Sequence, residues 1–214
     1  NFAKVLMISP AVLFHSAWAM VVSGCSGRDD VVFGTVLSGR LQGTVGAENM
    51  LGVFINTLPL RVKLGNSSVI DLVRQVQHSL LDLLPYEQAP LALAQRCSGV
   101  PRGAPLFSAM LNYRHSISID DELNNQPDLD IDFMSLASQE RSNYPLGLLV
   151  DDFGSSFILS VQVDLSVGAE RIVGYVQTAI AGLVEALQST PEQVISNVSI
   201  LPAAERHQLL VEWN

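Results

Sequence analysis

The sequence predicts an α/β fold, a mixed β-sheet with helices packed on it, in a chain of 214 residues. Two observations carry this prediction. Apolar residues recur every three or four positions in the longer segments, which is the period of a helix packed on one side. Between them lie short runs of β-branched and aromatic residues, which are typical of strands. We therefore expect five or six strands, with three long helices on one face of the sheet.

The first helix and the first strand are the clearest elements of the N-terminal part. Ser9 and Pro10 predict a helix start, a hydroxyl N-cap followed by proline at the first helical position. The following turns are apolar on nearly every side, so this helix should be buried and should end at Gly24. His15 within it is expected to be a packed core imidazole. Residues 31–37 then form a continuous β-prone run, as in a strand covered on both faces.

A second strand and a second long helix are predicted next. The strand covers residues 58–64. Ser68 and Asp71 resemble a capping box, and the helix that they open should end at Pro85. A short helix is expected at residues 91–96.

The second half of the chain is predicted to hold further strands and the third long helix. The expected elements are a strand at 106–113, an acidic loop at 116–129, a strand at 130–136, a hairpin of 146–150 with 157–165, and a helix at 169–187. The hairpin's second arm alternates apolar and polar residues, so one of its faces should be packed. After Pro191 the chain becomes irregular and ends in a short helical tail.

Composition excludes several classes of function. The net charge is −9, which argues against a nucleic-acid or anionic-membrane surface because phosphate neutralisation needs clustered Lys and Arg. Hydrophobic residues make up 48% and charged residues 15% of the chain. Such a composition suits a large buried sheet, or a surface normally covered by another domain. The sequence shows no secretory signal and no transmembrane stretch, and the cytoplasm is the simplest compartment.

No self-contained catalytic or metal site is predicted. The histidines are His15, His78, His115 and His207, and only His115 follows a predicted strand. No GxSxG elbow supports a serine nucleophile. Cys25 and Cys97 have neither metal-ligand spacing nor a disulfide framework. Asp151 and Asp152 lie beside a glycine in a predicted turn, which favours turn hydrogen bonds over acid/base work.

Three blocks of sequence carry a resemblance to a known family. Residues 30–40 read DVVFGTVLSGR, residues 52–61 read GVFINTLPLR, and residues 140–146 read ERSNYPL. A weaker block, YEQAPL at 86–91, lacks the Asp that the family usually places before its proline. In this order the blocks resemble the second half of a condensation domain from a nonribosomal peptide synthetase.

The resemblance implies a fold and an activity. Condensation domains resemble chloramphenicol acetyltransferase, with two lobes in a V. They form an amide between two thioesters carried on the phosphopantetheine arms of carrier proteins, which enter a tunnel between the lobes. The family's His-His-x-x-x-Asp-Gly motif lies in the N-terminal lobe and is missing here. Residues 1–200 are therefore expected to be the C-terminal lobe, and residues 201–214 resemble the start of a linker to an adenylation domain.

The resemblance also suggests roles for particular residues, none of them catalytic. Ser38, Asn56 and Thr57 would position the acceptor substrate. For Ser38 the alternative is a turn hydroxyl bonded to its own backbone, and Asn56 with Thr57 would alternatively tie a strand end to a neighbouring loop. The residues expected to hold the lobe junction are Arg61, Arg141 and Asn143.

The expected partners are the N-terminal lobe, carrier proteins and the adjacent adenylation domain. A lobe alone should expose an apolar junction face, through which the fragment would also form a homodimer. Residues 116–145 are candidates for a crossing to the other lobe or for a carrier-protein contact. Two other functions stay open: a non-catalytic docking module that binds carrier protein or adenylation domain, and a stand-alone acyltransferase that uses His115.

Overall fold

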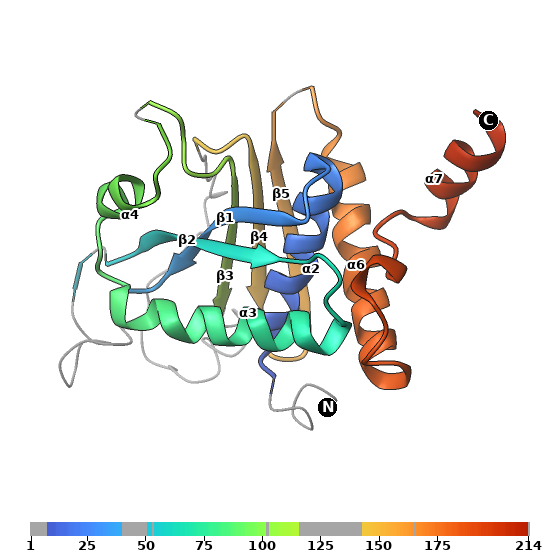
Figure 1. The fold of residues 1–214 in the computed structure, drawn as a ribbon, viewed down its shortest axis with the longest axis horizontal. Helices are drawn as coiled ribbons and strands as arrows, with labels where there is room; N and C mark the ends of the chain where they lie inside the picture. Colours follow the sequence, from blue (N-terminus) through green and yellow to red (C-terminus); the bar gives the residue numbers. More distant parts are fainter. Residues whose placement is uncertain are drawn as a thin grey trace, which may run out of the picture.

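Five strands form one mixed sheet in the computed structural model, which describes residues 8–39, 51–52, 54–101, 103–115, 143–164 and 166–213 (Figure 1). The spatial order is β2-β1-β3-β4-β5. Antiparallel pairs at the two edges, β1 with β2 and β4 with β5, flank the parallel pairs of β3 with β1 and with β4. The strands are β1 (Asp30–Leu37), β2 (Asn56–Lys63), β3 (Ala109–His115), β4 (Leu146–Asp152) and β5 (Phe157–Val163). The predicted mixed sheet is confirmed.

Three long helices, α2 (Pro10–Ser26), α3 (Val69–Leu83) and α6 (Ala169–Ser189), cover one face of this sheet. They contact one another, and each also contacts at least one strand (Figure 1). The shorter elements are η2 (Leu84–Tyr86), α4 (Leu91–Cys97), η3 (Ile195–Asn197), α7 (Ala203–His207) and η4 (Gln208–Glu212). The expected helices therefore form, and the three long ones pack on a single side.

The hydrophobic core lies between the helices and the sheet. Alternate residues of each strand point toward opposite faces, and the strand residues of the core all belong to one alternating set. They are Val31 and Phe33 of β1, Leu60 and Val62 of β2, Ala109 and Leu111 of β3, and Leu148 and Val150 of β4. The other set, which we call the open face, includes the half-buried Val32, Pro59 and Met110 and the exposed Ile158.

Helix α2 begins as predicted but ends later. The Ser9 side chain accepts a hydrogen bond from the N–H of Val12, and Pro10 follows the cap. The prediction that Gly24 ends the helix is wrong. Gly27 is the cap, with φ 66°, and its N–H donates to Ser23 O at 2.8 Å. The left-handed conformation that glycine tolerates well is needed at Gly27, whereas Gly24 stays helical.

Two other local predictions are tested by the structure. The Ser68 side chain accepts from the N–H of Asp71, as a capping residue should. The strand predicted at 106–113 begins only at Ala109, and the ring of Phe107 packs against Gly34 on the open face of β1. The strand predicted at 130–136 lies outside the described residues.

A strap formed by residues 198–202 is fitted against α6 and α2 at three glycines. A Cβ placed on Gly182 would lie 2.7 Å from Val198 Cγ1, one on Gly24 2.3 Å from Ile200 Cδ1, and one on Gly174 3.3 Å from Pro202 Cγ. The missing side chains therefore let the strap approach both helices closely, and its path fixes where the C-terminal tail starts.

His15 joins α2 to the sheet from inside the core. Its side chain is 3% exposed, and Thr35 of β1 is 1% exposed. Nδ1 lies 2.7 Å from Ala11 O and Nε2 lies 2.7 Å from Thr35 Oγ1. A carbonyl only accepts, so Nδ1 donates and the neutral ring's Nε2 accepts from the Thr35 hydroxyl. Burial lowers the pKa of His15 from 6.5 to about 4, although the bond to Ala11 opposes that shift.

This lowered pKa predicts an acid-dependent loss of stability. Above pH 6.5 both folded and unfolded His15 are neutral; between pH 6.5 and about 4 only the unfolded state takes up the proton. The free energy of unfolding should therefore decrease as the pH is lowered, by about 2 kcal/mol between pH 7 and pH 5 for this group. In His15→Gln that fall should be smaller by this amount, as measured by urea denaturation at both pH values. The exposed control His78→Gln should keep the full fall, and equal falls in all three proteins would contradict the assignment.

The strap predicts opposite signs for two glycine substitutions in α6. Alanine is favoured over glycine in a helix by about 1 kcal/mol. At Gly182 the new methyl would meet the branched, buried side chain of Val198, and overpacking of this kind costs about 1 to 3 kcal/mol. Gly182→Ala should therefore lower the free energy of unfolding, whereas Gly174→Ala, with more room, should leave it unchanged or raise it. Urea denaturation of both variants measures this, and stabilisation by Gly182→Ala would show that the strap is not seated there.

Candidate functional site

Three segments far apart in the sequence meet where β1 ends and β2 begins. We call this meeting point the loop junction, formed by residues 38–39, 54–57 and 86–89. Asn56 Nδ2 donates to Glu87 O at 2.9 Å and to Ala89 O at 2.8 Å, while its Oδ1 accepts from the N–H of Thr57 at 2.9 Å. Both amide hydrogens of Asn56 are thus engaged within the chain, in the strand-to-loop tie named above as the alternative to substrate contact.

The third segment joins through Gln88. Its Nε2 donates to Gly39 O at 2.6 Å. Gly39 has φ 69°, and a Cβ there would lie 1.9 Å from Phe54 O, so no other residue fits without moving the backbone. The side chain of Glu87 is also enclosed here, with the residue 1% exposed.

The side chains of Ser38 and Thr57 lie in different environments at this junction. Ser38 directly follows β1 and is exposed, so its hydroxyl is accessible to a ligand. Thr57 lies on the open face, where its Cγ2 would be 2.8 Å from a Cβ on Gly34. Phe107 lies over the same glycine and stacks on Tyr144, with ring centroids 5.2 Å apart. Whether Ser38, Asn56 and Thr57 position a substrate stays a prediction.

The residues expected at a lobe junction are only partly described. Arg61 makes a two-bond ion pair with Asp30 on the open face, Nε to Oδ1 at 2.9 Å and Nη2 to Oδ2 at 2.6 Å. This pair joins β2 to β1 and holds the pKa of Asp30 below its usual value. Asn143 is exposed just before β4, and Arg141 lies outside the described residues.

A second polar cluster lies where β3 and β4 end side by side, in register at His115 and Asp152. Asp152 is 5% exposed and accepts from the Tyr113 hydroxyl and from the N–H of Gly154, the latter at 2.7 Å. Burial disfavours its charge, yet these bonds hold the pKa of Asp152 below its usual value. Burial and the same bond raise the pKa of Tyr113.

His115 completes this cluster on its outer side. Its Nδ1 lies 3.2 Å from Asp152 Oδ2, and its side chain is 83% exposed. A carboxylate that holds one ring nitrogen and leaves the other in solvent is an arrangement also found in general bases. The expected turn bond of Asp152 is present, and Asp151 pairs with Arg114. The sequence predicted the two strands one by one. It did not predict that their ends lie side by side, because that depends on β3 and β4 being neighbours in the sheet.

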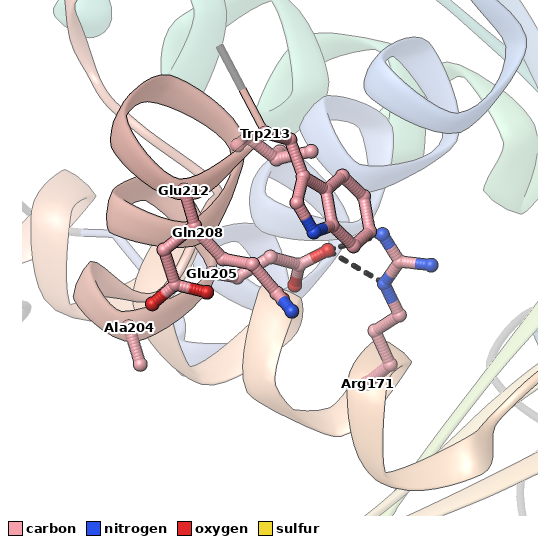
Figure 2. Close-up of a pocket in the computed structure, with 7 residues that line it drawn as sticks. Arg171, Ala204, Glu205, Gln208, Glu212 and Trp213 are labelled. Atoms are coloured by element: carbon pink, nitrogen blue, oxygen red, sulfur yellow. Dashed lines mark hydrogen bonds and ion pairs between the residues drawn. The ribbon is translucent and has the colours of Figure 1, made fainter.

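A third feature is a cavity of about 620 Å³ between α6 and the C-terminal tail (Figure 2). Glu205 Oε1 accepts from Arg171 Nε and from the Tyr175 hydroxyl, both at 2.6 Å. Figure 2 shows the indole of Trp213 beside this ion pair. The bonds from Arg171 and Tyr175 hold the pKa of Glu205 low. The residues that line the cavity are Arg171, Ala204, Glu205, Gln208, Leu209, Glu212 and Trp213. They include no Ser, Thr, Cys, Lys or His, and the Glu205 carboxylate is engaged by Arg171 and Tyr175, so this cavity suits tail attachment better than acyl transfer.

Other classes of site find no support in the described part of the chain. No three His, Cys, Asp or Glu side chains there are grouped to hold a metal ion. Cys25 and Cys97 are free and exposed. Among the helices that the structure describes, none is both long and apolar enough to cross a bilayer.

Comparison with known proteins decides the family. The model of the condensation domain family matches residues 2–210. The chain belongs to the condensation domain family. It is 47% identical to malpinin synthetase and 46% to malpibaldin synthetase, both of Mortierella alpina, over 99% of this chain but only 3% and 4% of those proteins. A linear gramicidin synthase of Brevibacillus parabrevis is 33% identical over 94% of this chain and 4% of its own.

Solved structures show the same fold. A four-domain nonribosomal peptide synthetase bound to AMP and glycine gives a TM-score of 0.74, at 19% identity, over 96% of this chain and 17% of that one. The condensation domain of monacolin K polyketide synthase gives 0.67, at 16% identity, over 90% of this chain and 44% of that one. This condensation domain chain therefore has the predicted chloramphenicol acetyltransferase-like fold.

The loop junction brings together three of the four sequence blocks on which the family resemblance was based. Gly39 lies near the end of the first block, Asn56 lies in the second, and Gln88 lies in the weaker one at 86–91. The missing Asp before Pro90 left the role of that weaker block open. The sequence did not predict that Gln88 bonds to Gly39. The available signal was a Gln inside a block that resembles the family.

The loop junction predicts a stability cost for losing the Asn56 amide. Asn56→Ala removes the donors of two partly buried carbonyls and should lower the free energy of unfolding by about 2 kcal/mol. Asn197→Ala, at an exposed position, serves as the matched control and should change it by less than about 0.5 kcal/mol. Urea denaturation compares the two, and equal effects would show that water replaces the amide without cost.

Proposed function

We propose that this chain is the acceptor-side, C-terminal lobe of a nonribosomal peptide synthetase condensation domain. In this role it positions a carrier-bound aminoacyl thioester for amide bond formation. One observation supports it above others. The alignment with a solved condensation domain includes 90% of this chain but only 44% of the solved one. A half of the domain is what such coverage suggests.

The catalytic base would then come from outside these residues. No two of the four histidines are adjacent in the sequence, so the His-His-x-x-x-Asp-Gly motif is not among its 214 residues. Proton removal from the acceptor amine would be carried out by the N-terminal lobe. This chain would contribute orientation, which in favourable cases supplies about 7 to 11 kcal/mol of barrier reduction.

Within the proposed lobe, Ser38 is the residue best placed to touch the acceptor. It is exposed at the carboxyl end of β1, and its hydroxyl can both donate to a thioester carbonyl and accept from an amine. Asn56 and Thr57 would act on the substrate indirectly, since Asn56 is engaged with Glu87 and Ala89. The acceptor would arrive on the phosphopantetheine arm of a carrier protein.

The open face is the proposed contact with the N-terminal lobe. Its half-buried Val32, Pro59 and Met110 are apolar, and the Arg61–Asp30 pair lies at its β2 edge. Arg141 and Asn143, at the end of the β3–β4 connection, would hold the same junction. In the isolated chain this face would also serve a homodimer.

The tail is the proposed start of the linker to an adenylation domain, with residues 1–200 as the lobe itself and residues 201–214 as the linker. The Glu205 bonds to Arg171 and Tyr175 attach it to α6. Beyond them Leu210, Val211 and Trp213 are 57%, 62% and 70% exposed. This apolar end also favours a second candidate function, a docking module that binds a neighbouring domain without taking part in catalysis.

The proposal predicts that the chain alone forms no amide. Donor and acceptor carrier proteins, each loaded with its aminoacyl thioester, would be mixed with the 214-residue chain and the product measured by mass spectrometry. We expect no product above background, because the proposed catalytic base lies outside these residues. In the parent synthetase, Ser38→Ala should lower the rate about tenfold through lost positioning.

The outcomes separate the candidates. Product from the chain alone that disappears in His115→Ala would support a stand-alone acyltransferase and contradict the proposal. A parent synthetase whose rate is unaffected by Ser38→Ala, and by other substitutions at the loop junction that leave it folded, would favour the docking module.

A further inference from the structure

Gln88 reaches a carbonyl on another segment while its own backbone is held on both sides. Asn56 Nδ2 donates to Glu87 O and Ala89 O, the residues that flank Gln88. The Gln88 side chain then donates from Nε2 to Gly39 O at 2.6 Å, across 49 positions of sequence. The bond therefore connects a turn fixed by β2 to the segment that leaves β1.

Gly39 is also confined by the backbone of Phe54. Its backbone is so close to Phe54 that a Cβ would lie 1.9 Å from Phe54 O and 2.7 Å from Gln88 Nε2. Gly39 is buried, whereas Ser38 immediately before it is exposed. The direction of the Ser38 side chain is set by its backbone dihedrals, and these are restrained by the fixed carbonyl of the next residue.

We propose that Gln88 is a positioning residue for Ser38. This inference rests on the proposed function, in which Ser38 contacts the acceptor thioester or its amine. Without the Gln88 bond the segment at 38–39 would lose one of the restraints that the described residues place on it. A displacement of about 1 Å at a positioning group can lower a rate about 100-fold, so a modest loosening suffices for a measurable effect.

The competing role for Gln88 is purely structural, as a bond that fastens the turn before α4 to the sheet. A structural bond affects stability, and activity would then fall only as far as the folded fraction falls. A positioning bond acts through Ser38, and its effect on the rate should vanish once the Ser38 hydroxyl is gone. A double-mutant cycle distinguishes these roles because coupled residues are non-additive.

The experiment compares Ser38→Ala, Gln88→Glu and the double variant in the intact parent synthetase. In Gln88→Glu a carboxylate oxygen faces Gly39 O, so the bond becomes a repulsion while the side chain keeps its size. At saturating acceptor carrier protein, each single variant should lower kcat for amide formation about tenfold, and the double variant should be no slower than Ser38→Ala. The melting temperature of each protein is measured in parallel.

Gln95 supplies the matched control. Its Nε2 also donates to a backbone carbonyl, Ala104 O at 3.1 Å, but at the far end of α4 from the loop junction. Gln95→Glu should leave kcat unchanged. Gln88→Ala removes the bond without setting two oxygens against each other, and it replaces Gln88→Glu in the cycle should that variant fail to fold.

Each result decides the matter. Rate losses that multiply in the double variant, or a normal kcat in the folded Gln88 variants, would overturn the role of Gln88 while leaving the proposed function intact. A normal kcat in Ser38→Ala would remove the contact that Gln88 is said to position. In that case the substrate role of Ser38 fails as well.

Discussion

The two amide hydrogens of Asn56 are the constraint on which the candidate site depends. Carbonyls removed from water need donors, and one side chain at the start of β2 supplies them to both Glu87 and Ala89. Since Asn56 Oδ1 is bonded to Thr57 N–H, its amide plane cannot rotate freely. The sheet therefore sets the position of the 87–89 turn, and Gln88 transmits that position to Gly39.

Local patterns predicted most of the fold. The capping box at Ser68 and the Ser9–Pro10 start depend on residues within one turn, and the second arm of the β4–β5 hairpin on alternation along a single strand. The end of α2 could not be predicted in this way. Gly24 and Gly27 look equivalent in sequence, but Gly24 is used for the approach of Ile200, a contact that only the tertiary fold brings about. The bond of Gln88 to Gly39 was missed for the same reason.

The strap shows how a chain end is given a defined direction. Along α6 the eight steps from Gly182 to Gly174 span about 12 Å, and the four steps from Val198 to Pro202 span about 13 Å when extended. The lengths match, so the strap runs antiparallel to α6 with both contacts satisfied. Glu205 then meets Tyr175, next to Gly174, and Arg171, slightly beyond it. A tail anchored at these points would transmit the orientation of α6 to whatever follows it.

A lobe without a base would still be able to contribute much of the rate. General base catalysis typically gives a factor of about 100 to 10,000, which corresponds to about 3 to 5 kcal/mol. Holding two reactants in line can contribute about 7 to 11 kcal/mol. In the proposed division of a condensation domain into a lobe with histidines and a lobe with positioning contacts, at least as much of the barrier reduction would come from the second lobe. On this reasoning the burial of Gly39 and the engaged amide of Asn56 are the features that matter, because positioning depends on backbone that does not move.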